Sequence, residues 1–215
     1  MKEISNVIAA NLLKIKAVSL NSKEPFKWAS GIYSPIYTDN RLTVSYPNVR
    51  KNIAEGFAKK IHEKFLNVDV IAGVATAGIP HAAWVAEKLN LPLIYVRSKP
   101  KEHGTKSQIE GVLKEGSQVI LIDDLFSTGG SVLKAVKAVR KAGGNILAVG
   151  SIFSYQLPQA TNNFELYNVS SFSLTNYFDL IKIALRKNYI DHYDFELLYS
   201  WHQNPIDWSK KYKQR

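Results

Sequence analysis

The chain has 215 residues, of which 46% are hydrophobic and 21% charged, so it can form one domain with a buried apolar core. It contains no cysteine, which excludes disulfides, thiol nucleophiles and zinc–thiolate sites. No apolar run approaches the roughly 20 residues of a membrane-spanning helix, and the first residues lack the apolar segment of a signal peptide. We therefore expect a single domain over residues 1–215 and a cytoplasmic location.

The net charge of +10 suits two kinds of partner. One is nucleic acid, whose phosphates bind lysine and arginine. The other is a small polyanionic substrate, which a positive field attracts. The sequence has no zinc-finger spacing and no aromatic RNA-binding motif, so we favour the small substrate over nucleic acid. The basic residues at 210–215 are interpreted as a solvated tail.

The N-terminal part divides into a helix, an irregular stretch and a second helix. Residues 2–18 place apolar side chains on one face, which predicts an amphipathic helix. Residues 21–46 are polar and aromatic, and Pro25 and Gly31 favour turns and extended chain there. Apolar residues recur at every fourth position over about 47–65, which predicts the second helix.

The rest of the chain alternates short apolar runs with amphipathic segments. Strands are expected at 68–74, 93–97, 119–122 and 146–153. Helices are expected at 80–90, from Ser131 to near Gly143, at 175–187 and at 191–200. This alternation predicts an α/β fold with a parallel sheet and helices on both faces.

Two connecting segments could meet an anionic ligand. The small residues Thr76, Ala77 and Gly78 follow the first strand of the sheet and allow close approach to the backbone, although such loops are common. Residues 98–110 are basic, polar and punctuated by glycine, which favours a flexible loop or lid. A solvated basic loop is the alternative.

The most informative stretch is residues 119–131, in which four apolar residues lead into two carboxylates, a hydroxyl-and-glycine loop and a helix. Ligands of open α/β sheets bind beyond the carboxyl ends of the strands, and a helix N-terminus binds anions. Asp123 and Asp124 accept hydrogen bonds from sugar hydroxyls, or bind a hydrated cation. The loop residues suit a phosphate: Ser127, Thr128, Gly129, Gly130 and Ser131. The pattern therefore fits a ribose 5-phosphate, and a plain strand–loop–helix with a capping serine is the alternative.

This stretch resembles the phosphoribosyl pyrophosphate (PRPP) signature of the type I phosphoribosyltransferases. Two other segments resemble orotate phosphoribosyltransferases. Residues 26–41 resemble the N-terminal hood, with Phe26, then Ser-Gly, then Ser-Pro and an aromatic residue. The catalytic-loop pattern Arg-x-x-x-Lys-x-His-Gly is matched at 97–104. The resemblance implies a type I phosphoribosyltransferase fold, a small hood from about residues 1–46 and a flexible catalytic loop at about 98–110.

The resemblance also implies a reaction and a set of site residues. PRPP and orotate would give orotidine 5′-monophosphate and pyrophosphate, a step of de novo pyrimidine synthesis. The expected catalytic residues are Lys101, His103, Asp123 and Asp124. The expected PRPP-binding residues are Arg97, Lys101, His103, Asp123, Asp124, Leu125, Phe126, Ser127, Thr128, Gly129, Gly130 and Ser131. Thr76, Ala77 and Gly78 would form the pyrophosphate loop, and Ser127 would contact orotate, with Lys27 and Arg41 as further candidates.

The family pattern further implies Mg²⁺, bound mainly through PRPP, and a homodimer with shared active sites. The chain departs from some family members by having Ala29, Ala77 and Ser98 where they have lysines, and no arginine stands near Tyr155. Which residue holds the orotate carboxylate is therefore left open. Two alternative functions remain: transfer to another base, such as a purine, and a non-catalytic regulator that binds nucleic acid.

Overall fold

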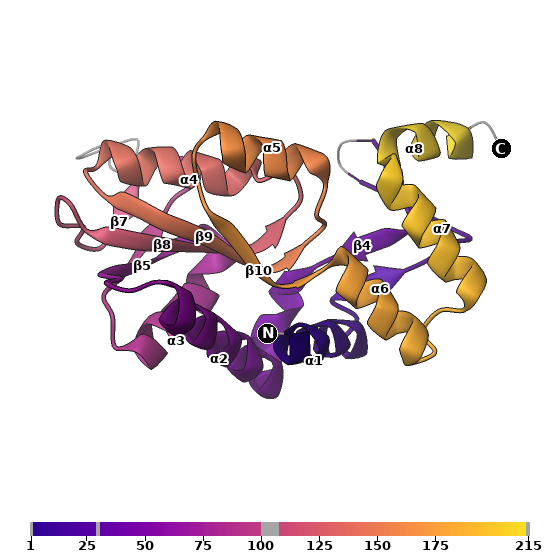
Figure 1. Cartoon of the computed structure of the whole chain (residues 1–215), viewed down its shortest axis with the longest axis horizontal. Coiled ribbons are helices and arrows are strands. Elements are labelled where there is room, and N and C mark those ends of the chain that lie inside the picture. The colour runs from indigo at the N-terminus through magenta and orange to yellow at the C-terminus, as the bar shows by residue number, and fades with distance from the viewer. Residues whose placement is uncertain (1, 29–30, 100–107, 214–215) are drawn as a thin grey trace.

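The computed structural model describes residues 2–28, 31–99 and 108–213, and within them a central sheet has six strands in the order β10-β9-β8-β5-β6-β7 (Figure 1). The strands are β5 (Val70–Val74), β6 (Leu93–Val96), β7 (Ile109–Glu110), β8 (Gln118–Phe126), β9 (Asn145–Ser154) and β10 (Ser171–Asn176). Neighbouring strands are parallel except β6 and β7, which are antiparallel. The predicted α/β fold with a mostly parallel sheet is confirmed.

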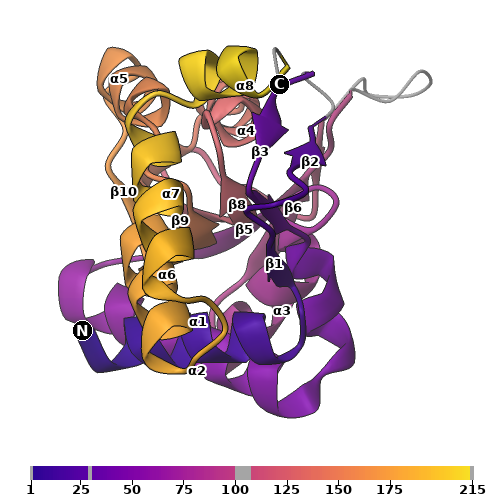
Figure 2. The same ribbon diagram turned by 90° about the vertical axis from the view of Figure 1, so that its right-hand side faces the viewer.

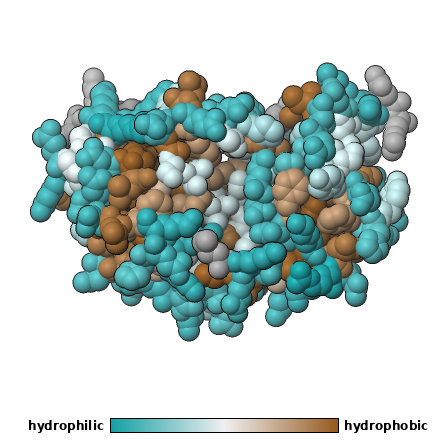
Figure 3. All heavy atoms as spheres, in the orientation of Figure 1, coloured by the Kyte–Doolittle hydropathy of each residue, from teal (hydrophilic) through white to brown (hydrophobic). Residues whose placement is uncertain are grey.

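Helices cover both faces of this sheet (Figure 1). One face carries α1 (Lys2–Lys14), α2 (Pro47–Lys64) and α3 (Gly78–Leu89), and the other carries α4 (Gly130–Lys141) and α5 (Pro158–Leu166). The strand β8 serves both cores, because Ile120 and Ile122 belong to one hydrophobic cluster and Val119 and Leu121 to the other. Figure 3 shows apolar side chains gathered between the two helix layers and hydrophilic ones over the outer surfaces.

The segment predicted to form the hood folds as two small antiparallel pairs and a 3₁₀ helix. The strands β1 (Val18–Leu20) and β4 (Ile36–Thr38) pair, as do β2 (Phe26–Lys27) and β3 (Tyr33–Ser34). The 3₁₀ helix η1 (Asn40–Ser45) follows β4 and leads into α2. The helix α1 instead packs on the main core, where its Ile8 and Leu12 are buried.

The C-terminal helices pack against the hood segment (Figure 2). They are α6 (Tyr177–Arg186), α7 (His192–Gln203) and α8 (Pro205–Lys213). Trp201 of α7 is fully buried among aromatic rings, with centroids 5.7 Å from Trp28 and 5.6 Å from Tyr177. On α8, Ser209 Oγ accepts a hydrogen bond of 2.9 Å from the Tyr33 N–H. Residues 210–213, predicted as part of a solvated tail, form the end of a helix packed on β3, and their lysines are exposed.

Several element boundaries differ from the predictions. The first helix ends at Lys14 rather than near residue 18, because Lys16 adopts φ +56° and the chain then enters β1. The strand predicted at 119–122 continues to Phe126, because β9 pairs with it as far as Ser154. Residues 109–110 form β7 rather than loop, and α5 and β10 were not predicted. No helix in the described ranges is both long and apolar enough to cross a bilayer.

The aromatic cluster around Trp201 should contribute strongly to stability. Trp201→Ala is expected to lower the free energy of unfolding by about 3–5 kcal/mol, because it leaves a large cavity between α7 and the hood. Leu166→Ala is the control, since Leu166 is 79% exposed and its loss should change stability by less than about 0.5 kcal/mol. Urea unfolding followed by circular dichroism measures both, and similar losses would contradict the assignment of this cluster.

Candidate active site

The two carboxylates lie within a strand, not in a turn after it. Pairing of β5 with β8 ends at Gly73 and Ile122, whereas β9 accompanies β8 to its end. Asp123 and Asp124 therefore lie past the last pair between β5 and β8, at the carboxyl edge of the sheet. This is the place where parallel α/β sheets bind their ligands.

Asp123 is held firmly and is almost completely buried. Its side chain is 5% exposed, Oδ1 accepts from the Asp124 N–H at 2.9 Å, and Oδ2 accepts from the Ser131 hydroxyl at 3.0 Å. Burial, reinforced by the charge of Asp124, raises the pKa of Asp123, and burial also raises the pKa of Asp124. Two adjacent carboxylates with little water around them favour a ligand that brings positive charge or hydroxyl donors. Because the single Ser131 proton is already used, contact of Ser131 with a phosphate would fall to its backbone N–H.

The loop after β8 presents the N-terminus of α4. Gly129 adopts φ +78°, and a Cβ there would lie 2.9 Å from the Phe164 ring, so glycine is required. The Asn163 side chain supports the loop by donating to the Thr128 carbonyl at 2.9 Å. No side chain in the described part of the chain caps α4, and its first backbone N–H groups are free for an anion.

Within the motif at 119–131, some side chains after the acidic pair pack in the core, and others lie in the loop that faces the ligand site. Phe126 is 2% exposed and packs on Phe164 at 5.1 Å between centroids, so its side chain belongs to the core. Leu125 is partly buried against the other core cluster. Ser127 to Gly129 form the loop between β8 and α4, and Gly130 and Ser131 begin α4.

The loop after β5 lies directly beside the acidic pair. A Cβ on Gly78 would come within 2.2 Å of the Ile122 carbonyl oxygen and 3.1 Å of the Asp123 Cα. Only glycine allows α3 to begin this close to β8. The predicted pyrophosphate loop, Thr76 to Gly78, is thereby brought next to Asp123.

The base of the predicted lid is ordered by the β6–β7 pair. Arg97 Nη1 lies 3.6 Å from Glu110 Oε1, and the Arg97 N–H donates to the Gln108 carbonyl at 2.8 Å. These contacts bring the two ends of segment 98–110 together at the edge of the sheet. The predicted catalytic residues Lys101 and His103 lie outside the described residues.

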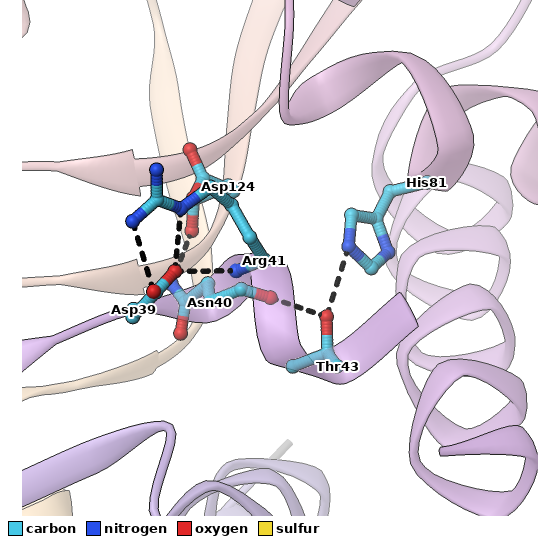
Figure 4. A network of polar contacts seen from close by, with 6 residues as sticks. All are labelled: Asp39, Asn40, Arg41, Thr43, His81 and Asp124. Atoms are coloured by element: carbon cyan, nitrogen blue, oxygen red, sulfur yellow. Dashed lines mark hydrogen bonds and ion pairs between the residues drawn. The ribbon is translucent and has the colours of Figure 1, made fainter. Parts of the chain in front are cut away.

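The two candidate cations for the orotate carboxylate differ in their surroundings. Arg41 makes a bidentate pair with Asp39, Nε to Oδ1 at 2.6 Å and Nη2 to Oδ2 at 2.8 Å (Figure 4). Its hydrogen bond lowers the pKa of Asp39. Lys27 is an exposed residue of β2. The Asp39 pair uses two of the five N–H donors of Arg41, and the Arg41 side chain is 68% exposed, so its remaining donors could meet a ligand carboxylate while Asp39 stays bound.

Asn40, Thr43 and His81 are buried polar residues near the site that the sequence did not mark (Figure 4). The Asn40 amide donates to the Asp124 main-chain oxygen at 2.7 Å, and Thr43 Oγ1 lies 3.1 Å from His81 Nε2. In the sequence, Asn40 and Thr43 are ordinary polar residues of a polar stretch, and His81 is one polar residue of an apolar helix. No local pattern could have identified them.

The close packing of Gly78 on β8 should be measurable. Gly78→Ala is expected to lower the free energy of unfolding by about 1–3 kcal/mol, because the new methyl group must displace backbone. Gly130→Ala is the matched control, since its Cβ would meet nothing closer than Thr128 Oγ1 at 3.7 Å and should cost less than about 0.5 kcal/mol. Urea unfolding compares the two, and equal losses would show that the contact with Ile122 is no constraint.

The burial of His81 should make stability depend on pH. Burial lowers the pKa of His81 to about 4 from its usual value of 6.5. Between these values the unfolded chain binds a proton that the folded chain does not. The stability contributed by neutral His81 is therefore complete above pH 6.5 and is lost as the pH falls toward 4. Asp123 and Asp124 act in the opposite direction, since their pKa values are raised.

A comparison of two chains isolates the histidine. Between about pH 7 and about pH 5, the free energy of unfolding should fall by about 2 kcal/mol more in the unmodified chain than in His81→Gln. Urea unfolding at the two pH values measures this difference. Equal changes in both chains would mean that His81 titrates normally in the folded state.

Comparisons with known proteins agree with this geometry. Residues 46–183 match the family described as phosphoribosyl transferase domain. The orotate phosphoribosyltransferases of Lactiplantibacillus plantarum and Enterococcus faecalis are 61% and 55% identical to the chain, over 97% and 98% of it and 98% and 100% of their own lengths. The crystal structure of orotate phosphoribosyltransferase from Aeropyrum pernix has a TM-score of 0.73 at 27% identity and covers 86% of this chain and 99% of that one. The chain belongs to the phosphoribosyltransferase family and, within it, to the orotate phosphoribosyltransferases.

Proposed function

We propose that the chain transfers the phosphoribosyl group of PRPP to orotate, giving orotidine 5′-monophosphate and pyrophosphate in pyrimidine synthesis. The observation that carries this proposal is the adjacent pair of the buried Asp123 and the partly buried Asp124, placed beside an uncapped helix N-terminus at the carboxyl edge of the sheet. The high identity to orotate phosphoribosyltransferases over nearly the whole chain supports orotate as the acceptor.

The ribose 5-phosphate would bind at the start of α4. Backbone N–H groups at 128–131 and the hydroxyls of Ser127 and Thr128 would donate to its oxygens, and the helix dipole favours the negative charge. The ribose hydroxyls would then reach Asp123 and Asp124. Of the two, Asp124 is the more available, because both Asp123 oxygens already accept hydrogen bonds.

The reaction is a substitution at the ribose C1 carbon. The C1–O bond breaks and pyrophosphate leaves with the electron pair. N1 of orotate forms the new bond to C1 and gives up its proton, which the departing pyrophosphate can accept. Positive charge develops on the ribose ring as the bond breaks, and the buried carboxylates stabilise it more strongly than they would in water. Positioning of the two substrates supplies much of the remaining acceleration.

The leaving pyrophosphate would lie between two loops. The backbone N–H groups of Thr76 to Gly78 approach it from one side, in place of the lysine that some family members have at the position of Ala77. Arg97, Lys101 and His103 would neutralise it from the lid, and lid closure would exclude the water that hydrolyses PRPP. These lid roles remain predictions.

Mg²⁺ fits this site as an ion bound mainly by the substrate. Within the described ranges no three His, Cys, Asp or Glu side chains form a group that could hold a metal ion. Magnesium is commonly held by one or two carboxylates together with substrate phosphates, and Asp124 offers such a carboxylate. When bound, the ion would neutralise the pyrophosphate charge.

We further propose a cytoplasmic homodimer with shared active sites, as the family resemblance implies.

The direct test is consumption of orotate in the presence of PRPP and Mg²⁺, followed by absorbance. Adenine, hypoxanthine and uracil are run in parallel. We expect turnover of orotate alone, because the catalytic-loop pattern at 97–104 and the close relatives both point to this base. Turnover of a purine instead would assign another base. Binding of PRPP with turnover of no base would favour a regulator, to be tested by nucleic-acid titration across salt.

The same assay tests the acidic pair. Asp124→Asn should lower kcat/KM by at least about 100-fold, since it removes charge opposite the developing cation. Asp191→Asn is the matched control: Asp191 caps α7 and is exposed, and asparagine is an equally good cap. Unchanged turnover in Asp124→Asn would remove this residue from the mechanism.

A further inference from the structure

The main chain of the acidic pair has a hydrogen-bond partner from outside the sheet. Beyond Ile122, β8 has β9 as its only accompanying strand in the described part of the sheet, because pairing with β5 has ended. Asn40 lies beside this part of β8, is 1% exposed, and its Nδ2 donates to the Asp124 carbonyl at 2.7 Å. The asparagine side chain thus supplies a donor such as a further strand would provide.

The same asparagine is connected to the helix that follows the pyrophosphate loop (Figure 4). Thr43 Oγ1 donates to the Asn40 carbonyl at 2.6 Å, so its single proton is used. Its contact of 3.1 Å with His81 Nε2 therefore requires the histidine to donate. Burial keeps His81 neutral at neutral pH, with the proton on Nε2. A continuous path of hydrogen bonds joins α3, η1 and β8.

This path is the second of two connections between α3 and β8 at the site. At one end, His81 lies in the first turn of α3, three residues after Gly78, whose backbone rests on β8 at Ile122. At the other end, Asn40 binds the carbonyl of Asp124. The pyrophosphate loop and the acidic pair are thus linked twice, once by the glycine contact and once through the hood.

Two buried atoms of the network lower the stability of the fold, so a purely structural role does not account for them. Asn40 Oδ1 and His81 Nδ1 are buried without a hydrogen-bond partner in the part of the chain that the structure describes. Each such atom costs about 1–3 kcal/mol, and apolar residues of similar shape would avoid that cost. Unsatisfied buried polar atoms in native proteins call for an explanation, and a functional role is one of them.

We infer that Asn40, Thr43 and His81 are positioning residues, which hold the acidic pair of β8 in a fixed place relative to the pyrophosphate loop. The inference rests on the proposed function, because only that reaction requires the acidic pair and the pyrophosphate loop to keep a fixed distance. A reacting ribose carbon lies between the carboxylates and the leaving group, and displacements of the order of 1 Å there reduce rates about 100-fold. The three residues act through the main chain and touch no substrate.

The test compares three threonine variants. Thr43→Val removes the hydroxyl at nearly constant volume, and Thr43→Ser keeps it. Thr175→Val is the matched control, because Thr175 is 1% exposed and its hydroxyl lies in a hydrogen-bonding contact of 3.0 Å with the Ser5 hydroxyl on α1, outside the network. We expect Thr43→Val to lower kcat at least tenfold with KM for PRPP changed less than threefold. Thr43→Ser should stay within threefold of the unmodified chain, and Thr175→Val should lose only thermal stability.

Hydrogen–deuterium exchange gives a readout that needs no turnover. In Thr43→Val the amides of peptides 75–81 and 122–128 should exchange faster than in Thr175→Val. Unchanged kcat together with unchanged exchange in Thr43→Val would overturn the inference, as would a fall in Thr43→Ser equal to that in Thr43→Val. If the unmodified chain fails to consume orotate while Thr43→Val still speeds exchange in these peptides, the proposed function fails and the positioning role stands.

Discussion

The structure depends on keeping two adjacent carboxylates out of water at the edge of the sheet. Asp123 is 5% exposed, and burial raises the pKa of both Asp123 and Asp124. An arrangement of this kind disfavours the ionised pair by itself and favours it once positive charge is present. A ribose ring that becomes cationic as pyrophosphate leaves is a ligand of the required sign. Folding places the two carboxylates where their ionised forms are destabilised by burial and by each other. The positive charge of the proposed transition state would relieve this destabilisation.

The surrounding elements serve this arrangement in different ways. The β9 strand accompanies β8 past the last β5–β8 pair, so the carboxylates lie where β8 no longer pairs with β5. Gly78 lets α3 begin against β8, and Gly129 lets the next loop turn into α4 beneath Phe164. The hood contributes from the other side, through the Asn40 amide. The C-terminal helices in turn hold the hood through the aromatic cluster around Trp201.

Local patterns in the sequence were sufficient for four strands of the sheet, for most helices and for the motif at 119–131, because apolar periodicity and loop chemistry are properties of neighbouring residues. They were insufficient where partners are distant in sequence. Asp123 was expected at a turn, but β9 keeps the chain extended to Phe126. The basic residues at 210–213 were expected to belong to a tail, but they form the end of α8, which the contact of Tyr33 with Ser209 joins to the hood. Asn40 and Thr43 become site residues only through tertiary packing, which no spacing reveals.

The most direct measurement is a crystal structure of the chain with PRPP and Mg²⁺. The account predicts the 5-phosphate at the backbone N–H groups of 128–131 and the ribose hydroxyls within hydrogen-bond distance of Asp123 or Asp124. It further predicts the pyrophosphate beside Thr76 to Gly78. A PRPP molecule bound elsewhere, with the acidic pair still buried and without contact to the ribose, would contradict the central claim.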